Sequence, residues 1–302
     1  MILYVKYSKY ITCLFLFSLL LNAGIQKSIA ASDKHKIDTT FINDEKRISQ
    51  LVSELIQIRF DDKRVDTLSK IVLNEFKTVL EKKGSFYYPF DSIFPVGKVV
   101  SKDGLVRIFT WYSVNAAGEF TYYGFIQYYS KTKKQVLLYE LYDKSNSIEE
   151  PVISKSLTNK DWYGCTYYEM VQSKSNYGEL YVLMGWDGNN IYTNKKIIES
   201  LVFTESGRPK FGKPVFVFGR KKVKRIVFEY SRMASMMIRY DENMKMIVMD
   251  HLSPSKPLFA GNPQYYGPDL SYDGLKFDDG VWKYIPTIDY KPIVKKKFLH
   301  KR

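Results

Sequence analysis

Histidine and cysteine are scarce in this sequence of 302 residues, which has three histidines and two cysteines. His35 and His300 lie near the two ends, so only His251 falls inside the body of the chain. This argues against a histidine-based metal site and against a catalytic triad. P-loop, dinucleotide-binding and Gly-x-Ser-x-Gly motifs are also missing. The sequence therefore predicts no cofactor and no bound metal.

Long hydrophobic runs are few as well. The longest one covers residues 11–21, directly after Lys6 and Lys9. It has about half the roughly 20 residues that a membrane-spanning helix needs. Ser28-Ile29-Ala30 supplies the small residues that signal peptidase recognises. We therefore expect a secretory signal peptide over residues 1–30 rather than a membrane anchor, and no transmembrane helix in the mature chain.

Removal of this segment also removes Cys13, so the mature chain retains Cys165 alone and cannot form an internal disulfide. Cys165 stands among aromatic residues in a predicted strand, which favours a small buried thiol over a reactive nucleophile. The hydrophobic core must then provide the stability, and about 270 mature residues are enough for that.

Acidic residues are outnumbered by basic ones, 32 against 46, which gives a formal charge of +14. The basic tail, residues 291–302, is one concentration of positive charge. The other is a predicted hairpin tip with five cations: Arg220, Lys221, Lys222, Lys224 and Arg225. A solvated turn and tail are the expected interpretation, and the alternative is a binding site for an anionic envelope polymer or another envelope protein. No nucleic-acid recognition motif accompanies the charge, so we expect no specific nucleic acid.

Apolar residues recur at helical spacing in two segments that follow a polar lead. The first segment includes Ile48, Val52 and Leu55, and the second begins at Asp61 or Asp62 and ends near Gly84. These segments predict a helical hairpin within residues 31–84. Its apolar stripes need a partner surface, and a sheet is the only candidate.

From residue 85 to about residue 290 the pattern changes to the two-residue period of strands, with 25 tyrosines in the whole chain. Short polar gaps leave no room for crossover helices. The predicted fold is mainly β, with the helical hairpin packed on a large antiparallel meander that forms a sandwich or an open barrel. A partial β-propeller is the alternative.

The stretch 161–190 is the expected centre of this β domain. Its apolar run, residues 181–186, ends in the turn signal Asp187-Gly188 and reads as a strand buried on both faces. A single helical turn is expected at residues 194–198, before a strand at 199–204. Trp186 beside Asp187 resembles a sugar-binding arrangement, so Trp162, Trp186 and Asp187 are candidate binding residues. The same residues are typical of strand ends and turns, which is the expected interpretation.

Methionine is concentrated near the only internal histidine. Six methionines fall within residues 233–249: Met233, Met236, Met237, Met244, Met246 and Met249. Thioethers with an imidazole suit Cu(I), but methionine also fills irregular gaps in a core. Alternation along strands would divide these residues between two faces, so core packing is the expected role.

Several short motifs resemble a group of uncharacterised exported proteins of Bacteroidota. The motifs are Trp162-Tyr163-Gly164, the segment from Leu183 to Asn189, and residues 272–277 followed by Trp282. The resemblance implies an exported β-rich protein and no catalytic residue. The lack of a separate C-terminal sorting domain favours the periplasm over the cell surface.

The sequence thus predicts an exported, non-catalytic binding or envelope-associated protein, in the periplasm or outer envelope. The alternative is a hydrolase acting on envelope glycan. Its acid and base would be sought among Asp161, Glu169 and Asp187, the carboxylates nearest the central hairpin.

Overall fold

A computed structural model describes residues 41–58, 60–148, 152–176 and 178–291. The chain divides into two units, Met1–Asn43 and Asp44–Arg302. All elements discussed here belong to the second unit, apart from the first two residues of the first helix. The predicted signal peptide and residues 292–302 of the predicted basic tail lie outside the described residues.

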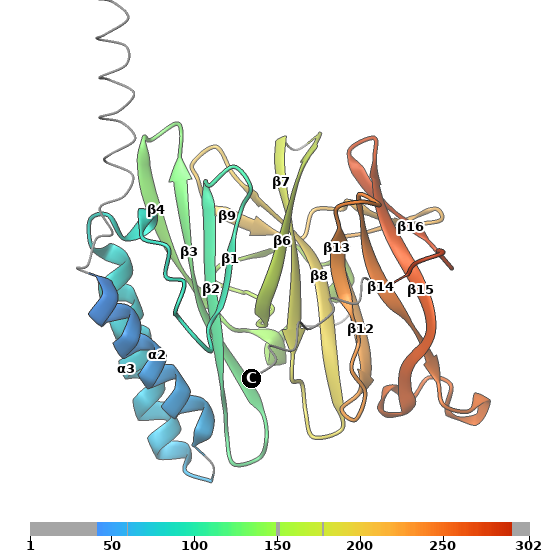
Figure 1. Cartoon of the computed structure of the whole chain (residues 1–302), viewed down its shortest axis with the longest axis horizontal. Helices are drawn as coiled ribbons and strands as arrows, with labels where there is room; N and C mark the ends of the chain where they lie inside the picture. Colours follow the sequence, from blue (N-terminus) through green and yellow to red (C-terminus); the bar gives the residue numbers. More distant parts are fainter. Residues whose placement is uncertain (1–40, 59, 149–151, 177, 292–302) are drawn as a thin grey trace, which may run out of the picture. The chain divides into compact units, whose positions relative to one another are not determined.

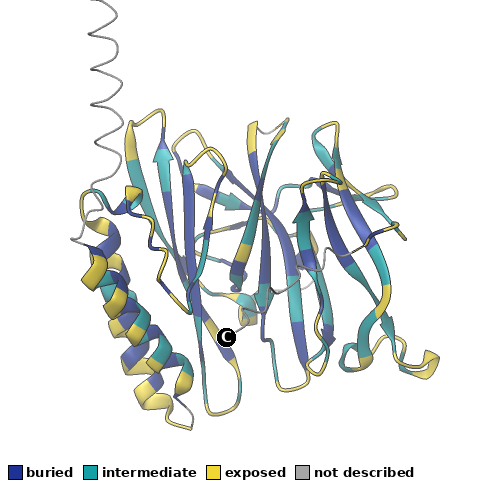
Figure 2. Cartoon of the chain, viewed as in Figure 1, coloured by how far each residue is buried: buried dark blue, intermediate teal, exposed yellow. Residues whose placement is uncertain are grey.

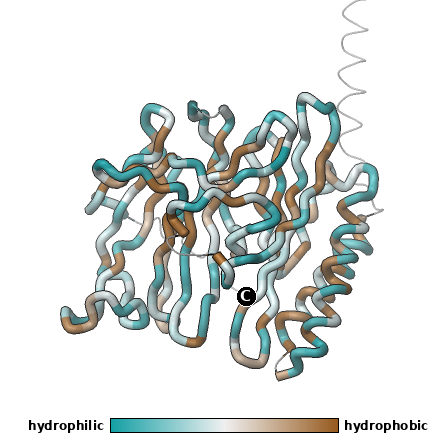
Figure 3. Tube along the Cα trace, turned by 180° about the vertical axis from the view of Figure 1, so that it is seen from behind, coloured by the Kyte–Doolittle hydropathy of each residue, from teal (hydrophilic) through white to brown (hydrophobic). Residues whose placement is uncertain are grey.

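Two antiparallel helices form the predicted helical hairpin, α2 (Ile42–Gln57) and α3 (Asp62–Glu81) (Figure 1). Asp61 caps α3, because its side chain accepts a hydrogen bond from the Arg64 backbone N–H at 3.0 Å. Hydrophilic and hydrophobic residues alternate along both helices at the helical period (Figure 3). Surface ion pairs join the helices: Arg47–Glu75, Arg64–Glu54 and Lys82–Asp44.

The first sheet is a four-stranded antiparallel meander in the order β1-β2-β3-β4. Its strands are β1 (Gly97–Val100), β2 (Val106–Val114), β3 (Phe120–Ser130) and β4 (Gln135–Tyr142). The apolar stripe of α3 packs on one face of this sheet, where Phe76 stacks on Trp111 with ring centroids 4.3 Å apart. The sheet is therefore the partner surface that the helical hairpin requires.

The middle sheet has the order β5-β9-β8-β7-β6, and β12 also pairs with β8. Its strands are β5 (Leu157–Thr158), β6 (Thr166–Ser175), β7 (Gly178–Asp187), β8 (Thr193–Phe203), β9 (Pro209–Phe211) and β12 (Arg225–Ser231).

The third sheet has the order β11-β10-β16-β15-β14-β13. Its strands are β10 (Phe216–Phe218), β11 (Lys221–Val223), β13 (Ile238–Asp241), β14 (Met246–Pro254), β15 (Tyr266–Asp278) and β16 (Val281–Ile285). All neighbours in it are antiparallel except β10 and β16.

Side chains of β7 alternate between two hydrophobic clusters. Tyr181 and Leu183 pack with residues of the first sheet, whereas Leu180, Val182 and Met184 pack with residues of the third sheet. The middle sheet is thus buried on both faces at β7, and β7 and β8 carry long dark-blue stretches of buried residues in Figure 2. This confirms the prediction of a central strand buried on both sides.

The predicted mainly β fold with an N-terminal helical hairpin is confirmed. The sheets are largely antiparallel, and none of the three closes into a barrel within the described segments. The helical turn expected at residues 194–198 is wrong, because this segment lies inside β8 and pairs with β7 on one side and β12 on the other. Among the described residues, no helix has the length and apolar character needed to cross a membrane.

Candidate functional site

The predicted binding residues Trp162, Trp186 and Asp187 come together in one packed corner. Trp186 packs against the rings of Tyr112 and Phe120, with centroids 5.8 and 5.7 Å away. Asp187 is buried and accepts a hydrogen bond from the Tyr122 hydroxyl at 2.8 Å. Burial raises the pKa of the Asp187 carboxyl above its ordinary value.

Trp162 is fully buried in the same corner, where its ring meets the edge of Tyr122. Its Nε1–H donates to the Tyr167 hydroxyl at 2.8 Å. Each polar group of Trp162 and Asp187 named here therefore bonds to another part of the fold. The corner holds strand ends together and offers no open ring face at Trp162 for a ligand.

The predicted five-cation tip is not a single cluster, because Arg225 lies in the core. Its side chain is fully buried, and its Nε donates to Glu199 Oε2 at 2.8 Å. Tyr167 donates its hydroxyl to the other oxygen of Glu199. Burial lowers the pKa of Arg225, but the adjacent Glu199 more than offsets this and holds the pKa above its ordinary value. Arg225 is part of an internal ion pair rather than a partner surface.

The rest of the basic segment is partly as expected. Arg220, Lys221 and Lys222 are exposed on the hairpin that joins β10 and β11. Lys224 is half-buried, and its backbone N–H donates to the Ile153 carbonyl at 2.8 Å. The exposed tip therefore carries three cations instead of five.

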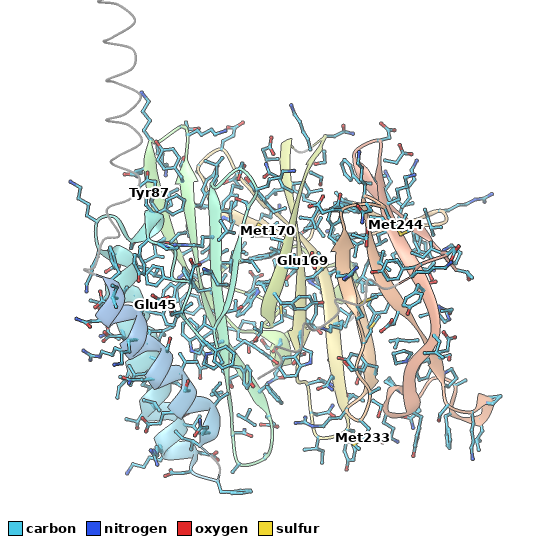
Figure 4. All side chains as sticks on the ribbon, viewed as in Figure 1. Glu45, Tyr87, Glu169, Met170, Met233 and Met244 are labelled. Atoms are coloured by element: carbon cyan, nitrogen blue, oxygen red, sulfur yellow. The ribbon has the colours of Figure 1, made fainter. Side chains whose placement is uncertain are left out.

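All three carboxylates near the central hairpin accept hydrogen bonds from other residues of the chain. Asp161 Oδ1 accepts from the Thr158 backbone N–H at 2.5 Å, and Glu169 Oε1 accepts from the Tyr240 N–H at 3.1 Å. Glu169 lies on β6 and is labelled in Figure 4. Together with Asp187, these carboxylates position strands and turns.

The methionines do not form one cluster. Met233 and Met244 lie at opposite ends of the strands (Figure 4), and Met233 is 95% exposed. Met236 and Met249 are buried between the middle and third sheets, as expected for core packing. Within the described ranges, no group of three or more His, Cys, Asp or Glu side chains is placed to hold a metal ion. Cys165 is buried, and burial raises the pKa of its thiol.

A cleft of about 600 Å³ opens beside β4. This volume is in the range of small-ligand sites. The lining comes from α3, β3, β4, the end of β5 with the segment after it, and the start of β9 with the turn before it: Lys77, Glu81, Phe125, Leu138, Tyr139, Glu140, Tyr142, Thr158, Asn159, Lys160, Arg208 and Pro209. It is the candidate functional site.

The cleft lies at the edge of β4, because both faces of this strand contribute to its lining. Glu140 pairs with Phe125, whose ring packs against Phe76 of α3. Tyr139 pairs with Ile126, which belongs to the cluster between the first and middle sheets. Successive side chains of a strand point to opposite faces of the sheet. A space lined by two successive residues therefore lies at the open edge of the strand, where its backbone is exposed.

The hydrogen-bond register shows which backbone groups of β4 face this space. Tyr129 of β3 donates its N–H to Leu105 at 2.8 Å and therefore faces β2, so Tyr128 faces β4. Tyr128 is paired with Leu137. Because bonded positions alternate in an antiparallel ladder, the odd-numbered residues of β4 bond to β3 and the even-numbered residues point outward.

One end of this edge is already paired. The Tyr142 N–H donates to Asn159 O at 2.8 Å, and the Asn159 side chain donates to Glu140 O at 2.9 Å. The N–H and C=O groups of Val136 and Leu138, and the Glu140 N–H, have no hydrogen-bond partner in the part of the chain that the structure describes. A row of free backbone donors and acceptors thus runs from Val136 into the cleft, whose lining includes Leu138 and Glu140.

Three cations surround this row. The Lys160 ammonium lies 4.2 Å from the centroid of the Tyr142 ring. Arg208 follows the turn at Gly207, whose carbonyl accepts the Tyr139 hydroxyl at 2.8 Å. Gly207 has φ of +81°, and a Cβ there would lie 2.6 Å from the Leu137 side chain, so the turn requires glycine. Lys77, on α3, is the third cation.

All three cations, Lys77, Lys160 and Arg208, are exposed and have no carboxylate partner among the described residues. The lining also includes Glu81 and Glu140, so its formal charge is +1 from three cations and two carboxylates. The charge balance favours an anionic ligand.

Sequence reasoning missed this cleft, although one signal pointed to it. Residues 135–142 lie between a lysine-rich turn, 131–134, and a long polar loop, 143–150. Lysines beside a short strand are typical of an edge strand. The three cations come from segments far apart in the sequence, so no local pattern brings them together.

The chain matches no protein-family model, and no curated protein or solved structure is significantly similar to it. The resemblance to exported proteins of Bacteroidota therefore stays a prediction.

Proposed function

We propose that this protein is an exported, non-catalytic binding protein of the cell envelope that holds an anionic partner in the cleft beside β4. The observation that carries the proposal is the set of three unpaired cations, Lys77, Lys160 and Arg208, around a cleft of about 600 Å³. Cations without an internal carboxylate partner can pair with carboxylate, phosphate or sulfate groups of a ligand.

Export is the part of the proposal supported by the sequence alone. The basic start, the short apolar run and Ser28-Ile29-Ala30 have the pattern of a cleaved signal. Mass spectrometry of the protein from the envelope fraction should show an N-terminus near Ala31. An intact Met1 on protein from that fraction would contradict it.

A matched pair of variants tests the binding site. One variant has Lys77, Lys160 and Arg208 replaced by Gln, and the control has Arg220, Lys221 and Lys222 replaced by Gln. Each removes three positive charges from exposed positions. Binding of heparin and of poly-L-glutamate is measured by titration at low and at moderate salt.

We expect the cleft variant to bind at least one of these polyanions ten times more weakly or worse, and the control to bind it within a factor of three of the wild type. Equal losses in the two variants would assign the binding to net charge rather than to the cleft. The same samples are assayed for new reducing ends. Cleavage of a glycan that depends on a cleft residue would favour the hydrolase alternative.

A further inference from the structure

The free backbone groups of β4 define the chemical class of the partner more narrowly than the charge of the cleft does. Free N–H donors at Val136, Leu138 and Glu140, with free carbonyl acceptors at the first two, recur every second residue, about 7 Å apart, which is the repeat of an extended polypeptide. Strands added to a sheet edge use this pattern for affinity and use side-chain pockets for specificity. A sugar chain has no matching row of amide groups.

We propose that the edge of β4 binds an extended, acidic polypeptide segment of another protein as an additional strand of the first sheet. This inference rests on the proposed function and names the class of its ligand. The segment pairs with residues 136–140, so about five of its residues contact the edge. The added strand ends before Tyr142, because the Tyr142 backbone N–H already donates to the Asn159 carbonyl.

The two sides of the cleft differ in chemistry, and this determines the side chains of the segment. Phe125 and Leu138 form an apolar surface on the side of α3, where the Glu81 and Glu140 carboxylates outnumber the single cation, Lys77. Arg208 and Tyr139 lie on the side of the middle sheet. Side chains of a strand alternate between two faces. The segment therefore places apolar side chains towards α3 and carboxylates towards Arg208.

Charge excludes two other occupants of the edge. A second copy of this chain would bring the same lysines of residues 131–134 and the same cleft cations to the contact. The chain's own residues 292–302 contain five Lys or Arg residues and no Asp or Glu. Both would add like charges to a basic edge, which opposes pairing.

The test uses a fluorescein-labelled heptapeptide with Glu at its odd positions and Val at its even positions. Its affinity for the full mature chain is measured by fluorescence anisotropy. Two further peptides carry backbone N-methyl groups, one at all Glu positions and the other at all Val positions. N-methylation removes the N–H donors along one edge of the peptide strand only. We expect one methylated peptide to bind at least tenfold more weakly than the parent and the other within threefold.

A protein variant provides a second measurement. Proline at an edge position whose N–H points outward leaves the ladder to β3 intact. Leu138→Pro should therefore lower peptide affinity at least tenfold with little change in the melting temperature, whereas Leu138→Ala should stay within threefold. If Leu138→Pro does not fold, binding of the methylated peptides to the wild-type protein still tests strand addition.

Equal affinities of the two methylated peptides, whether both bind or neither does, would overturn the inference. Binding of heparin that requires Lys77, Lys160 and Arg208, with no binding of the peptide, would overturn the inference and leave the proposed function standing. If neither polyanion nor peptide responds to the three cleft substitutions, both proposals fail.

Discussion

The interior of the middle sheet and the cleft beside β4 contain the same kinds of groups, arranged in opposite ways. Both combine aromatic rings, cations and carboxylates. In the interior, Arg225 and Tyr167 both donate to Glu199, and all three side chains are inaccessible to solvent. In the cleft, Arg208 and Lys160 have no carboxylate partner among the described residues. Internal pairing thus marks the structural groups, whereas the candidate site combines cations that lack a carboxylate partner with a cleft that they line.

The largest effect is expected at the internal ion pair. Arg225→Met leaves the Glu199 carboxylate buried without its cation, and such a change costs about 3–5 kcal/mol of unfolding free energy. The double variant with Glu199→Leu removes both charges and should recover most of the loss. Urea unfolding of the two variants provides the comparison. If the single and double variants are equally unstable, the cost comes from lost packing instead of from an unpaired charge.

Arg208→Met is the matched change in the cleft. Because Arg208 is exposed and has no ion pair, the free energy of unfolding should change by no more than about 0.5 kcal/mol. A loss comparable to that of Arg225→Met would show that the cleft cation stabilises the fold.

An effect smaller than that of Arg225→Met is expected at the packed corner. Trp186→Ala removes a ring that packs against Tyr112 and Phe120, so we expect a loss of about 3 kcal/mol, near the lower end for large aromatic residues. Tyr192→Ala, in the adjacent loop, is the control, because Tyr192 is 62% exposed. An unchanged urea midpoint in Trp186→Ala would show that this ring is free to contact a ligand.

The fold could be predicted from the sequence wherever a local pattern agrees with the tertiary contacts. The apolar stripe of α3 and the continuous apolar run of β7 are of this kind. Residues 194–198 are not, because their lysines suggest a helical turn, whereas pairing with β7 and β12 makes them a strand. Arg225 was grouped with its basic neighbours, since nothing local indicates the buried Glu199. The cleft depends on Lys77 and Arg208, which only the fold brings together.

A pH-dependent effect is expected at a partly exposed pair in the third sheet. The hydrogen bond between His251 Nδ1 and Asp273 raises the pKa of His251 above its ordinary 6.5. The folded state therefore holds this proton more tightly than the unfolded state does. The stabilisation is present below about pH 6.5 and is lost as the pH rises through the folded-state pKa.

The melting temperature of the wild type should therefore fall more between about pH 6 and pH 8 than that of His251→Gln. The His251 side chain is 43% exposed, so solvent screens the pair and the difference should be small. If the melting temperatures of the wild type and of His251→Gln change equally over this pH range, the pair does not couple protonation to folding.

The smallest effect on stability is expected at the exposed basic turn. Replacement of Arg220, Lys221 and Lys222 by Gln should change the free energy of unfolding by no more than about 0.5 kcal/mol, because these side chains make no ion pair within the described ranges. It should also release no partner from the native protein. A co-purifying anionic polymer that moderate salt releases, and that this variant lacks, would move the partner site from the cleft to the turn.

The most direct test of the central claim is amide hydrogen exchange at β4, followed by NMR with and without the alternating Glu and Val heptapeptide. The account predicts that the Val136, Leu138 and Glu140 amides exchange quickly in the free protein and become protected when the peptide binds. The Leu137 and Tyr139 amides should be protected in both states, because they bond to β3. Bound peptide with unchanged exchange at Leu138 and Glu140 would contradict strand addition at this edge.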